Sequence, residues 1–124
     1  MRYIMCFLLV LSGPACVAHS WTPTYPDLEP SYVDGVYVAE MELWNSRADV
    51  NYYTFEVFDD EWAHVPWAAQ ERNAPIRYLE RKKINIYIRQ GDLPRVRYIC
   101  SRSLHVKSNK TASLVSSRIC SKIR

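Results

Sequence analysis

Two cysteines and two histidines are the residues of this sequence that could do chemistry together: Cys100, Cys120, His64 and His105. Such a set can form a disulfide, act as a reactive thiol pair, or bind zinc through sulfur and imidazole. The nineteen residues between the cysteines do not fit the close cysteine pairs of zinc sites. We therefore expect a Cys100–Cys120 disulfide, with a reactive thiol pair as the alternative, and no metal or other cofactor.

Catalysis has little support in the sequence, because no nucleophile lies in a recognisable setting beside a base. We therefore expect no catalytic residues and a protein that is not an enzyme. A disulfide that closes a loop of about 20 residues would contribute on the order of 3 kcal/mol to the stability of a small domain.

The N-terminal segment is typical of a secretory signal peptide. A basic start at Met1-Arg2 precedes an apolar run from Tyr3 to Leu11, and small residues follow up to Ser20. We expect a signal peptide over residues 1–20 and a secreted, extracellular protein; a buried N-terminal helix is the alternative. The segment contains the other two cysteines, so its removal leaves one pair. No other long apolar run exists, which predicts no membrane span.

The charge of the chain is divided between its two halves. Residues 21–71 contain eleven acidic residues and one basic residue, whereas residues 72–124 contain fourteen basic residues and two acidic residues. The halves should attract one another within one small domain, or leave a basic face for acidic partners. A polyanion is thus one expected partner, whereas nucleic acid is not. The basic residues expected to bind it are Arg81, Lys82, Lys83, Arg95, Arg97 and Arg102.

These residues must be positioned by a helix and several strands. Three prolines within residues 21–31 predict a flexible, extended arm. After the arm, apolar residues recur at three- and four-residue steps between Val33 and Trp44, which predicts a helix. The β-branched valines of this segment favour a strand as the alternative.

Alternating apolar residues predict strands over 52–58, 78–90 and 95–106, and the tail from 113 to 123 could add another. Gly91 to Pro94 is expected to be a hairpin loop between two of these strands. Residues 59–76 form a long connection with two tryptophans, which suggests function; the alternative is that the tryptophans fold back onto the sheet. The predicted fold class is α+β, with one N-terminal helix packed across a four-to-five-stranded antiparallel sheet.

This order of elements resembles the type 2 cystatins. The residues that carry the likeness are Ile99-Cys100-Ser101 with Cys120, Leu43-Trp44-Asn45, Tyr53 to Val57, and Ile84 to Arg89. The reduced cysteine set is most similar to that of the divergent cystatin-9 group of the reproductive tract. The resemblance implies a cystatin-like domain over residues 32–124, in which Cys100 and Cys120 form the second disulfide of the family.

The motifs with which cystatins inhibit papain-like cysteine proteases are absent or replaced. The arm has no glycine, no Gln-x-Val-x-Gly occurs, and residues 107–111 replace the Pro-Trp loop. A rebuilt protease-contact loop could use Val65, Pro66 and Trp67 instead. Asn109 starts a glycosylation signal, Asn-Lys-Thr, in the region of the second loop.

Three functions follow as hypotheses. The first is a secreted cystatin-fold binding module that is non-inhibitory or weakly inhibitory and has a protein partner. The second is a cysteine protease inhibitor with a rebuilt first loop, whose partners would be papain-like proteases. The third is a polyanion-binding or host-defence protein.

Overall fold

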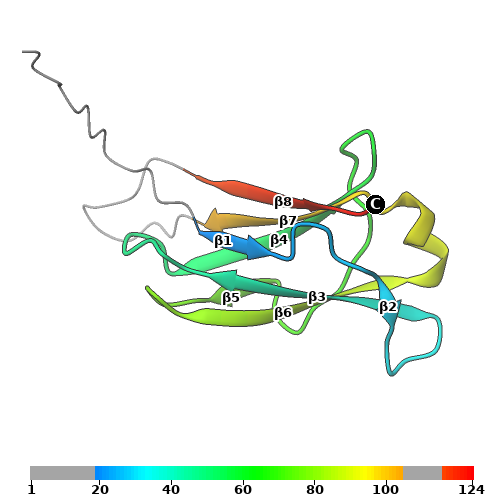
Figure 1. The fold of residues 1–124 in the computed structure, drawn as a ribbon, viewed down its shortest axis with the longest axis horizontal. Helices are drawn as coiled ribbons and strands as arrows, with labels where there is room; N and C mark the ends of the chain where they lie inside the picture. The colour runs from blue at the N-terminus through cyan, green and yellow to red at the C-terminus, as the bar shows by residue number, and fades with distance from the viewer. Residues whose placement is uncertain (1–18, 105–115) are drawn as a thin grey trace, which may run out of the picture.

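The computed structural model describes residues 19–104 and 116–124, which form two antiparallel β-sheets packed face to face (Figure 1). Sheet A contains β1 (Ser20–Thr22), β2 (Glu29–Pro30), β3 (Val36–Trp44) and β6 (Arg81–Arg89). Sheet B contains β4 (Tyr52–Phe58), β5 (Asn73–Pro75), β7 (Tyr98–Leu104) and β8 (Arg118–Lys122). A short 3₁₀ helix, η1 (Gln90–Arg95), connects β6 with β7.

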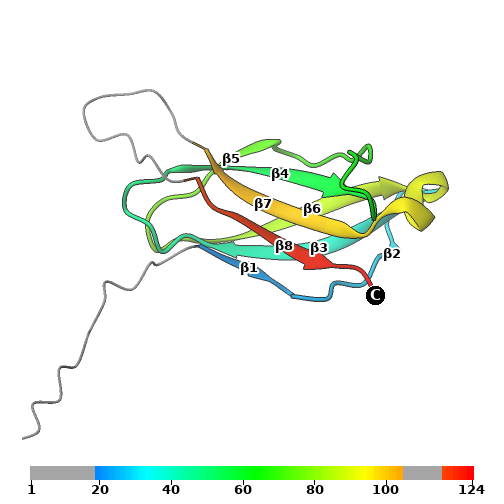
Figure 2. The ribbon, with the colours of Figure 1, turned by 90° about the horizontal axis from the view of Figure 1, so that it is seen from above.

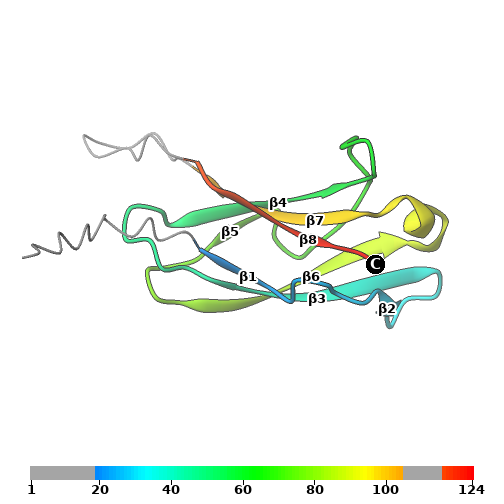
Figure 3. The ribbon, with the colours of Figure 1, turned by 45° about the horizontal axis from the view of Figure 1, so that its top comes forward.

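The strand order is that of an immunoglobulin-like sandwich. In sheet A, β3 pairs with β6 on one edge and with β1 and β2 on the other; in sheet B the order is β5-β4-β7-β8. With β1 and β2 as strand A, β3 to β8 take the places of B, C, C′, E, F and G. The turned views show the two layers, with β8 and β1 along facing margins (Figures 2 and 3).

The predicted α+β fold with an N-terminal helix is wrong, because the segment assigned to the helix forms β3. Ala39, Met41 and Leu43 are buried at every second position, with Glu40 and Glu42 between them facing outward. Burial of every second residue is the pattern of a strand with one buried face, whereas a helix would bury residues three and four positions apart. The valines that favoured the strand alternative fit this pleated, half-buried surface. The helix across a sheet that the cystatin resemblance implied is therefore absent from the described residues.

The strand predicted over 52–58 is confirmed as β4, and β6, β7 and β8 lie within the runs predicted as strands over 78–90, 95–106 and 113–123. The hairpin predicted at Gly91–Pro94 is wrong, since β6 and β7 belong to different sheets and η1 carries the chain between them. The segment expected to be a free arm instead contributes β1 and β2 to sheet A.

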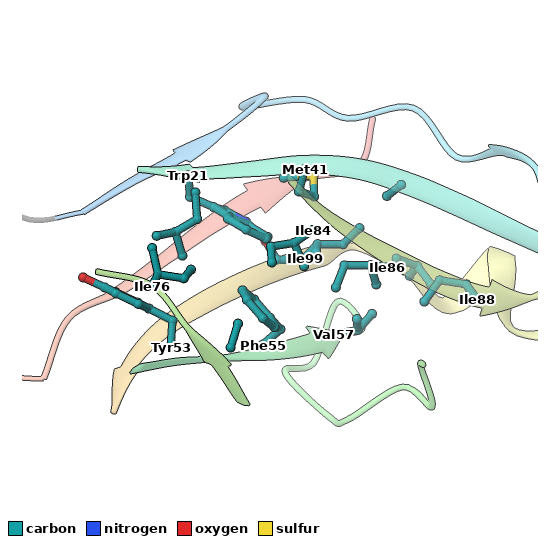
Figure 4. Packing of buried hydrophobic residues seen from close by; sticks show 14 of the residues in the cluster. Trp21, Met41, Tyr53, Phe55, Val57, Ile76, Ile84, Ile86, Ile88 and Ile99 are labelled. Atoms are coloured by element: carbon teal, nitrogen blue, oxygen red, sulfur yellow. The ribbon is translucent and has the colours of Figure 1, made fainter. Parts of the chain in front are cut away.

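The core lies between the two sheets and is built from the alternate, inward-facing side chains of their strands (Figure 4). Trp21 of β1 stacks on Phe55 of β4 with ring centres 5.3 Å apart, and its indole nitrogen donates a 3.0 Å hydrogen bond to the Ile99 carbonyl oxygen. These contacts tie sheet A to sheet B. Large buried members of the core include Trp21, Met41, Tyr53, Phe55, Val57, Ile76, Ile84, Ile86, Ile88 and Ile99.

Candidate functional site

The predicted protease-contact residues do not form an exposed wedge. Val65 is 1 % exposed and belongs to the core. Trp67 is half-buried, with its ring edge-on to Phe55 at 6.5 Å and the Arg72 guanidinium 5.1 Å from its centre. Pro66 is the exposed member of the three. The loop therefore folds back onto the sandwich at Val65 and Trp67; the alternative, that both tryptophans fold back onto the sheet, holds for Trp67, whereas Trp62 is 51 % exposed.

The six basic residues expected to bind a polyanion are divided between the two sheets. Arg81, Lys82 and Lys83 lie on β6 of sheet A, Arg102 lies on β7 of sheet B, and Arg95 and Arg97 lie in or after η1. Five of the six have a carboxylate partner within ion-pair distance. The pairs are Arg81 with Glu42, Lys82 with Glu71, Arg95 with Asp92, Arg97 with Asp60, and Arg102 with Glu56.

Cys100 and Cys120 form a disulfide between the neighbouring strands β7 and β8. They face one another in the register with Cα atoms 4.0 Å apart, the close spacing of a non-hydrogen-bonded antiparallel pair. The expected glycosylation site at Asn109 and the histidine at 105 lie outside the described residues. Among the residues that are described, no group of three or more His, Cys, Asp or Glu side chains is placed to hold a metal ion.

The outer face of sheet B carries an ion-pair cluster beside the disulfide. The carboxylate of Glu56 lies 3.3 Å from Arg102 Nε and 3.0 Å from an Arg118 terminal nitrogen. Glu56 Oε2 and Arg102 Nε are buried, and the contacts are not aligned as hydrogen bonds. One carboxylate thus lies between two guanidinium groups, and its charge balances only one of them.

Next to this cluster, an aromatic group covers the same face of sheet B. Trp62 stacks on Tyr98 with ring centres 4.1 Å apart and planes 6° from parallel, while 51 % of Trp62 is exposed. Beneath them, the buried ring of Phe58 contacts Trp62 at 5.5 Å and His64 at 4.9 Å. The Arg118 guanidinium lies 5.4 Å from the centre of the Phe58 ring, so the ion-pair cluster and the aromatic group are continuous.

The loop that presents Trp62 is strained and rigidly held. Trp62 has a φ of 62°, in the left-handed region that bulky residues rarely adopt. The Asp59 side chain accepts hydrogen bonds of 2.9 Å from the backbone N–H groups of Glu61 and Ala63. The Asp59 backbone bonds to both Trp62 and Ala63. These bonds fix an exposed indole in a conformation that most sequences avoid.

The free margin of β8 has backbone groups that point away from the sheet. Ser103 N–H donates to the Ser117 carbonyl and Ile123 N–H donates to the Arg97 carbonyl, so odd-numbered residues make the hydrogen bonds between β7 and β8. The even-numbered residues of β8 must then direct their N–H and C=O groups outward. Lys122 does so, since its N–H donates to the Thr24 carbonyl at 3.0 Å.

The outward groups of Arg118 and Cys120 have no backbone hydrogen-bond partner among residues 19–104 and 116–124. β1 runs beside β8 and pairs with β3, and residues 19–24 contact residues 117–122 through side chains at Ser117 and Ser121 and through the backbone at Lys122. The open edge of β8, defined as Arg118 to Cys120, thus offers donors and acceptors to another strand.

A buried polar network joins β1 to sheet B. His19 is 2 % exposed; its Nε2 lies 2.7 Å from Ser101 Oγ and its Nδ1 3.2 Å from Ser117 Oγ. Burial, with a smaller contribution from the charge of Arg47, lowers the pKa of His19 to about 4. The ring is therefore neutral at pH 7 and is engaged in structure.

Tyr53 continues this network. Its ring meets the His19 ring edge-on at 4.7 Å, and its hydroxyl donates a 2.6 Å hydrogen bond to the buried side chain of Asn45. Burial raises the pKa of Tyr53 to about 12. The two residues link the start of β1 to the connection between β3 and β4.

No family model, curated protein or solved structure matches this chain. Membership of the cystatin family therefore stays a prediction, while the fold that it implied is corrected by the two-sheet structure. No helix in the described part of the chain is both long and apolar enough to cross a membrane.

Sequence reasoning did not single out Glu56, Trp62 or Arg118. The Cys100–Cys120 pair could have indicated the arginine cluster, because an antiparallel pairing of these two cysteines also places Arg102 opposite Arg118. The alternation of β4 places Glu56 on the outer face, between inward-facing neighbours. No sequence signal indicates that Trp62, rather than Trp67, is the exposed tryptophan, since this depends on a left-handed turn.

Proposed function

We propose that this protein is a secreted binding module that recognises an extended segment of a partner protein by strand addition at the open edge of β8. Strand addition uses main-chain hydrogen bonds for affinity and alternate side chains for specificity. The observation that carries the proposal is the outward direction of the N–H and C=O groups of Arg118 and Cys120, which no described backbone group satisfies.

The residues around this edge also support binding of a partner strand. The disulfide holds β8 against β7, so the edge is presented by a strand that is already in place. Ile119 and Ile123 face the core side of β8 and pack against the core, so apolar contacts also hold this strand in place. A pre-formed edge lowers the ordering cost of binding.

Secretion and a binding role fit the chemistry of the described residues. A disulfide persists in an oxidising compartment, in agreement with the predicted signal peptide. The two cysteines are consumed by this bond, and His19 is buried in a structural network. Binding is therefore proposed in preference to catalysis.

The two other functions considered from the sequence have less support. A rebuilt protease-contact loop would need Val65 and Trp67 to be available, but Val65 is in the core and Trp67 packs on Phe55. Polyanion binding would need an array of free cations, but five of the six expected residues have carboxylate partners.

The proposal is tested by selecting linear peptides from a random phage-displayed library on the oxidised protein, followed by amide hydrogen exchange with the selected peptide bound. We expect exchange at the Arg118 and Cys120 amides to slow by about tenfold or more. Lys83 and Asn85 of β6 serve as the control edge, because Tyr87 bonds to Ala68 on that side and places their amides outward too. Peptides that protect no β8 amide would refute strand addition at this edge.

A pair of variants separates the backbone of β8 from its side chains. Arg118→Pro removes one outward N–H without removing a bond to β7, whereas Arg118→Gln keeps that N–H. For an uncharged peptide, we expect Arg118→Pro to weaken binding by about tenfold, a cost of about 1.4 kcal/mol, and Arg118→Gln to have little effect. Equal binding by both variants, with circular dichroism showing both folded, would contradict the proposal.

A further inference from the structure

The outer face of sheet B presents two features that packing alone does not require. The first is Trp62, which is strained in backbone and half-exposed in side chain. A left-handed backbone conformation is unfavourable for a residue with a side chain, because its Cβ lies too close to the following carbonyl oxygen. Strain that persists at an exposed position, held by surrounding hydrogen bonds, is a mark of functional sites.

The second feature is a pair of arginines near Trp62, whose own loop also carries Asp59, Asp60 and Glu61. Arg102 and Arg118 share the single carboxylate of Glu56, and their side chains remain 41 % and 44 % exposed. Lys122 adds a further cation in the same row of the sheet as Tyr98. The guanidinium groups keep donors that Glu56 does not satisfy, so an incoming carboxylate would find a site already arranged.

The two features are adjacent because they contact one ring. The Arg118 guanidinium lies 5.4 Å from the centre of Phe58, and the Trp62 indole lies 5.5 Å from the same centre. One face of Trp62 is covered by Tyr98. A ligand with a carboxylate close to a flat side chain could therefore place the carboxylate on the arginines and stack the ring on Trp62.

We propose that this surface, which we define by Phe58, Trp62, Tyr98, Arg102 and Arg118, is a second recognition site that binds an acidic protein segment containing an aromatic residue. It is distinct from the open edge of β8, since it uses side chains on the outer face and does not need strand pairing. The two arginines that share one carboxylate and the exposed indole determine the proposed occupant. A long polyanionic sugar would need a row of free cations, whereas the cations here are two arginines held around one carboxylate.

The probe for this site is a random copolymer of glutamate and tyrosine, immobilised for biolayer interferometry with the oxidised protein, residues 19–124. Polyglutamate tests the need for a ring, and a copolymer of lysine and tyrosine tests the need for negative charge. We expect the glutamate–tyrosine copolymer to bind about tenfold more tightly than either control polymer, and its binding to weaken as salt is raised.

The variants that test the site are Trp62→Ala and Arg102→Gln. Each is expected to weaken binding by about tenfold or more, because one removes the stacking surface and the other an arginine that is not on the β8 edge. The matched control is Arg81→Gln on sheet A, whose guanidinium also contacts a carboxylate and stacks on a tryptophan, Trp44. It should change binding by less than about twofold.

Trp62→Gly is the control for a loss of folding, because it removes the indole and also relieves the strain of the left-handed backbone. It should lose binding while its thermal midpoint stays close to that of the native protein. The site is refuted if Trp62→Ala and Arg102→Gln bind as Arg81→Gln does, or if the lysine–tyrosine copolymer binds equally well. Displacement of the copolymer by heparin at lower concentration than by its own soluble form would overturn the assignment to a protein segment. None of these outcomes depends on protection of the Arg118 and Cys120 amides, so the two sites are tested separately.

Discussion

His19 shows how much one residue can contribute to joining two sheets. Its imidazole is buried and neutral, with the hydroxyls of Ser101 and Ser117 beside its two nitrogens and the Tyr53 ring edge-on to it. A neutral imidazole donates from one nitrogen and accepts at the other, which two serine hydroxyls can match. Protonation would place a charge in this buried site near the positive Arg47.

Stability should therefore fall when the solution becomes acidic. The pKa of His19 is about 4 in the folded protein, against about 6.5 when unfolded. The unfolded chain then binds more protons below pH 6.5, so stability is complete above that pH and is lost as the pH falls toward 4. We expect a loss of about 2 kcal/mol from this group between pH 7.5 and pH 5.0, measured by urea unfolding.

The control for this prediction is His19→Gln, which cannot be protonated in this range. Its stability should be lower than that of the native protein at pH 7.5 but should change less between the two pH values. An equal pH dependence for the two proteins would show that other groups are responsible.

At the scale of elements, β8 is a short strand whose position depends on covalent attachment. It pairs with β7 along one side, and its other side is hydrogen-bonded to Thr24 at Lys122. The disulfide at the centre of β8 links residues separated by 20 positions. Both proposed recognition surfaces include residues of β8, so both depend on this attachment.

Removing the disulfide with the double substitution Cys100→Ser and Cys120→Ser should lower the free energy of unfolding by about 3 kcal/mol, because the unfolded chain regains the freedom of the closed loop. Urea denaturation of the two proteins measures the difference. Faster amide exchange should be concentrated in β8, while β3 and β6 should remain protected. A uniform increase in exchange across both sheets would indicate that β8 is not a separately attached element.

At the scale of the whole molecule, the two charged halves of the chain interleave. The pairs that join an acidic residue of the first half with a basic residue of the second include Glu42–Arg81, Glu71–Lys82 and Asp60–Arg97. The expectation that the halves attract one another within one domain agrees with these contacts. Because such surface pairs contribute little each, burial between the sheets supplies most of the stability.

The N-terminal boundary of the domain follows from the same packing. The predicted signal peptide, residues 1–20, includes His19 and Ser20, which the structure places in the buried network and in β1. A chain that starts at Pro23 lacks these residues and also Trp21, which is 4 % exposed and bridges the sheets. Compared with a chain that starts at His19, we expect it to be less stable by about 4 kcal/mol in urea unfolding. Equal unfolding midpoints would show that β1 is dispensable.

The sequence by itself determined the local features: the bounds of β4, the existence of β6 and β7, and one cysteine pair near the C-terminus. Strict alternation of apolar and polar residues specifies a strand without reference to distant parts of the chain. For the segment 36–44 this reasoning gave the wrong result, because its apolar residues are spaced by two, three and four positions and so fit both a strand and a helix. Only pairing with β6 and β1 selects the strand.

Only the tertiary structure decided how these strands are grouped and which side chains remain available. Whether β6 pairs with β7 or crosses to a second sheet depends on the total apolar area that can be buried, which is a property of all strands together. The exposure of Trp62, the burial of Val65 and the sharing of Glu56 by two arginines follow from that grouping. Each depends on contacts between residues far apart in the chain, which spacing along the sequence does not encode.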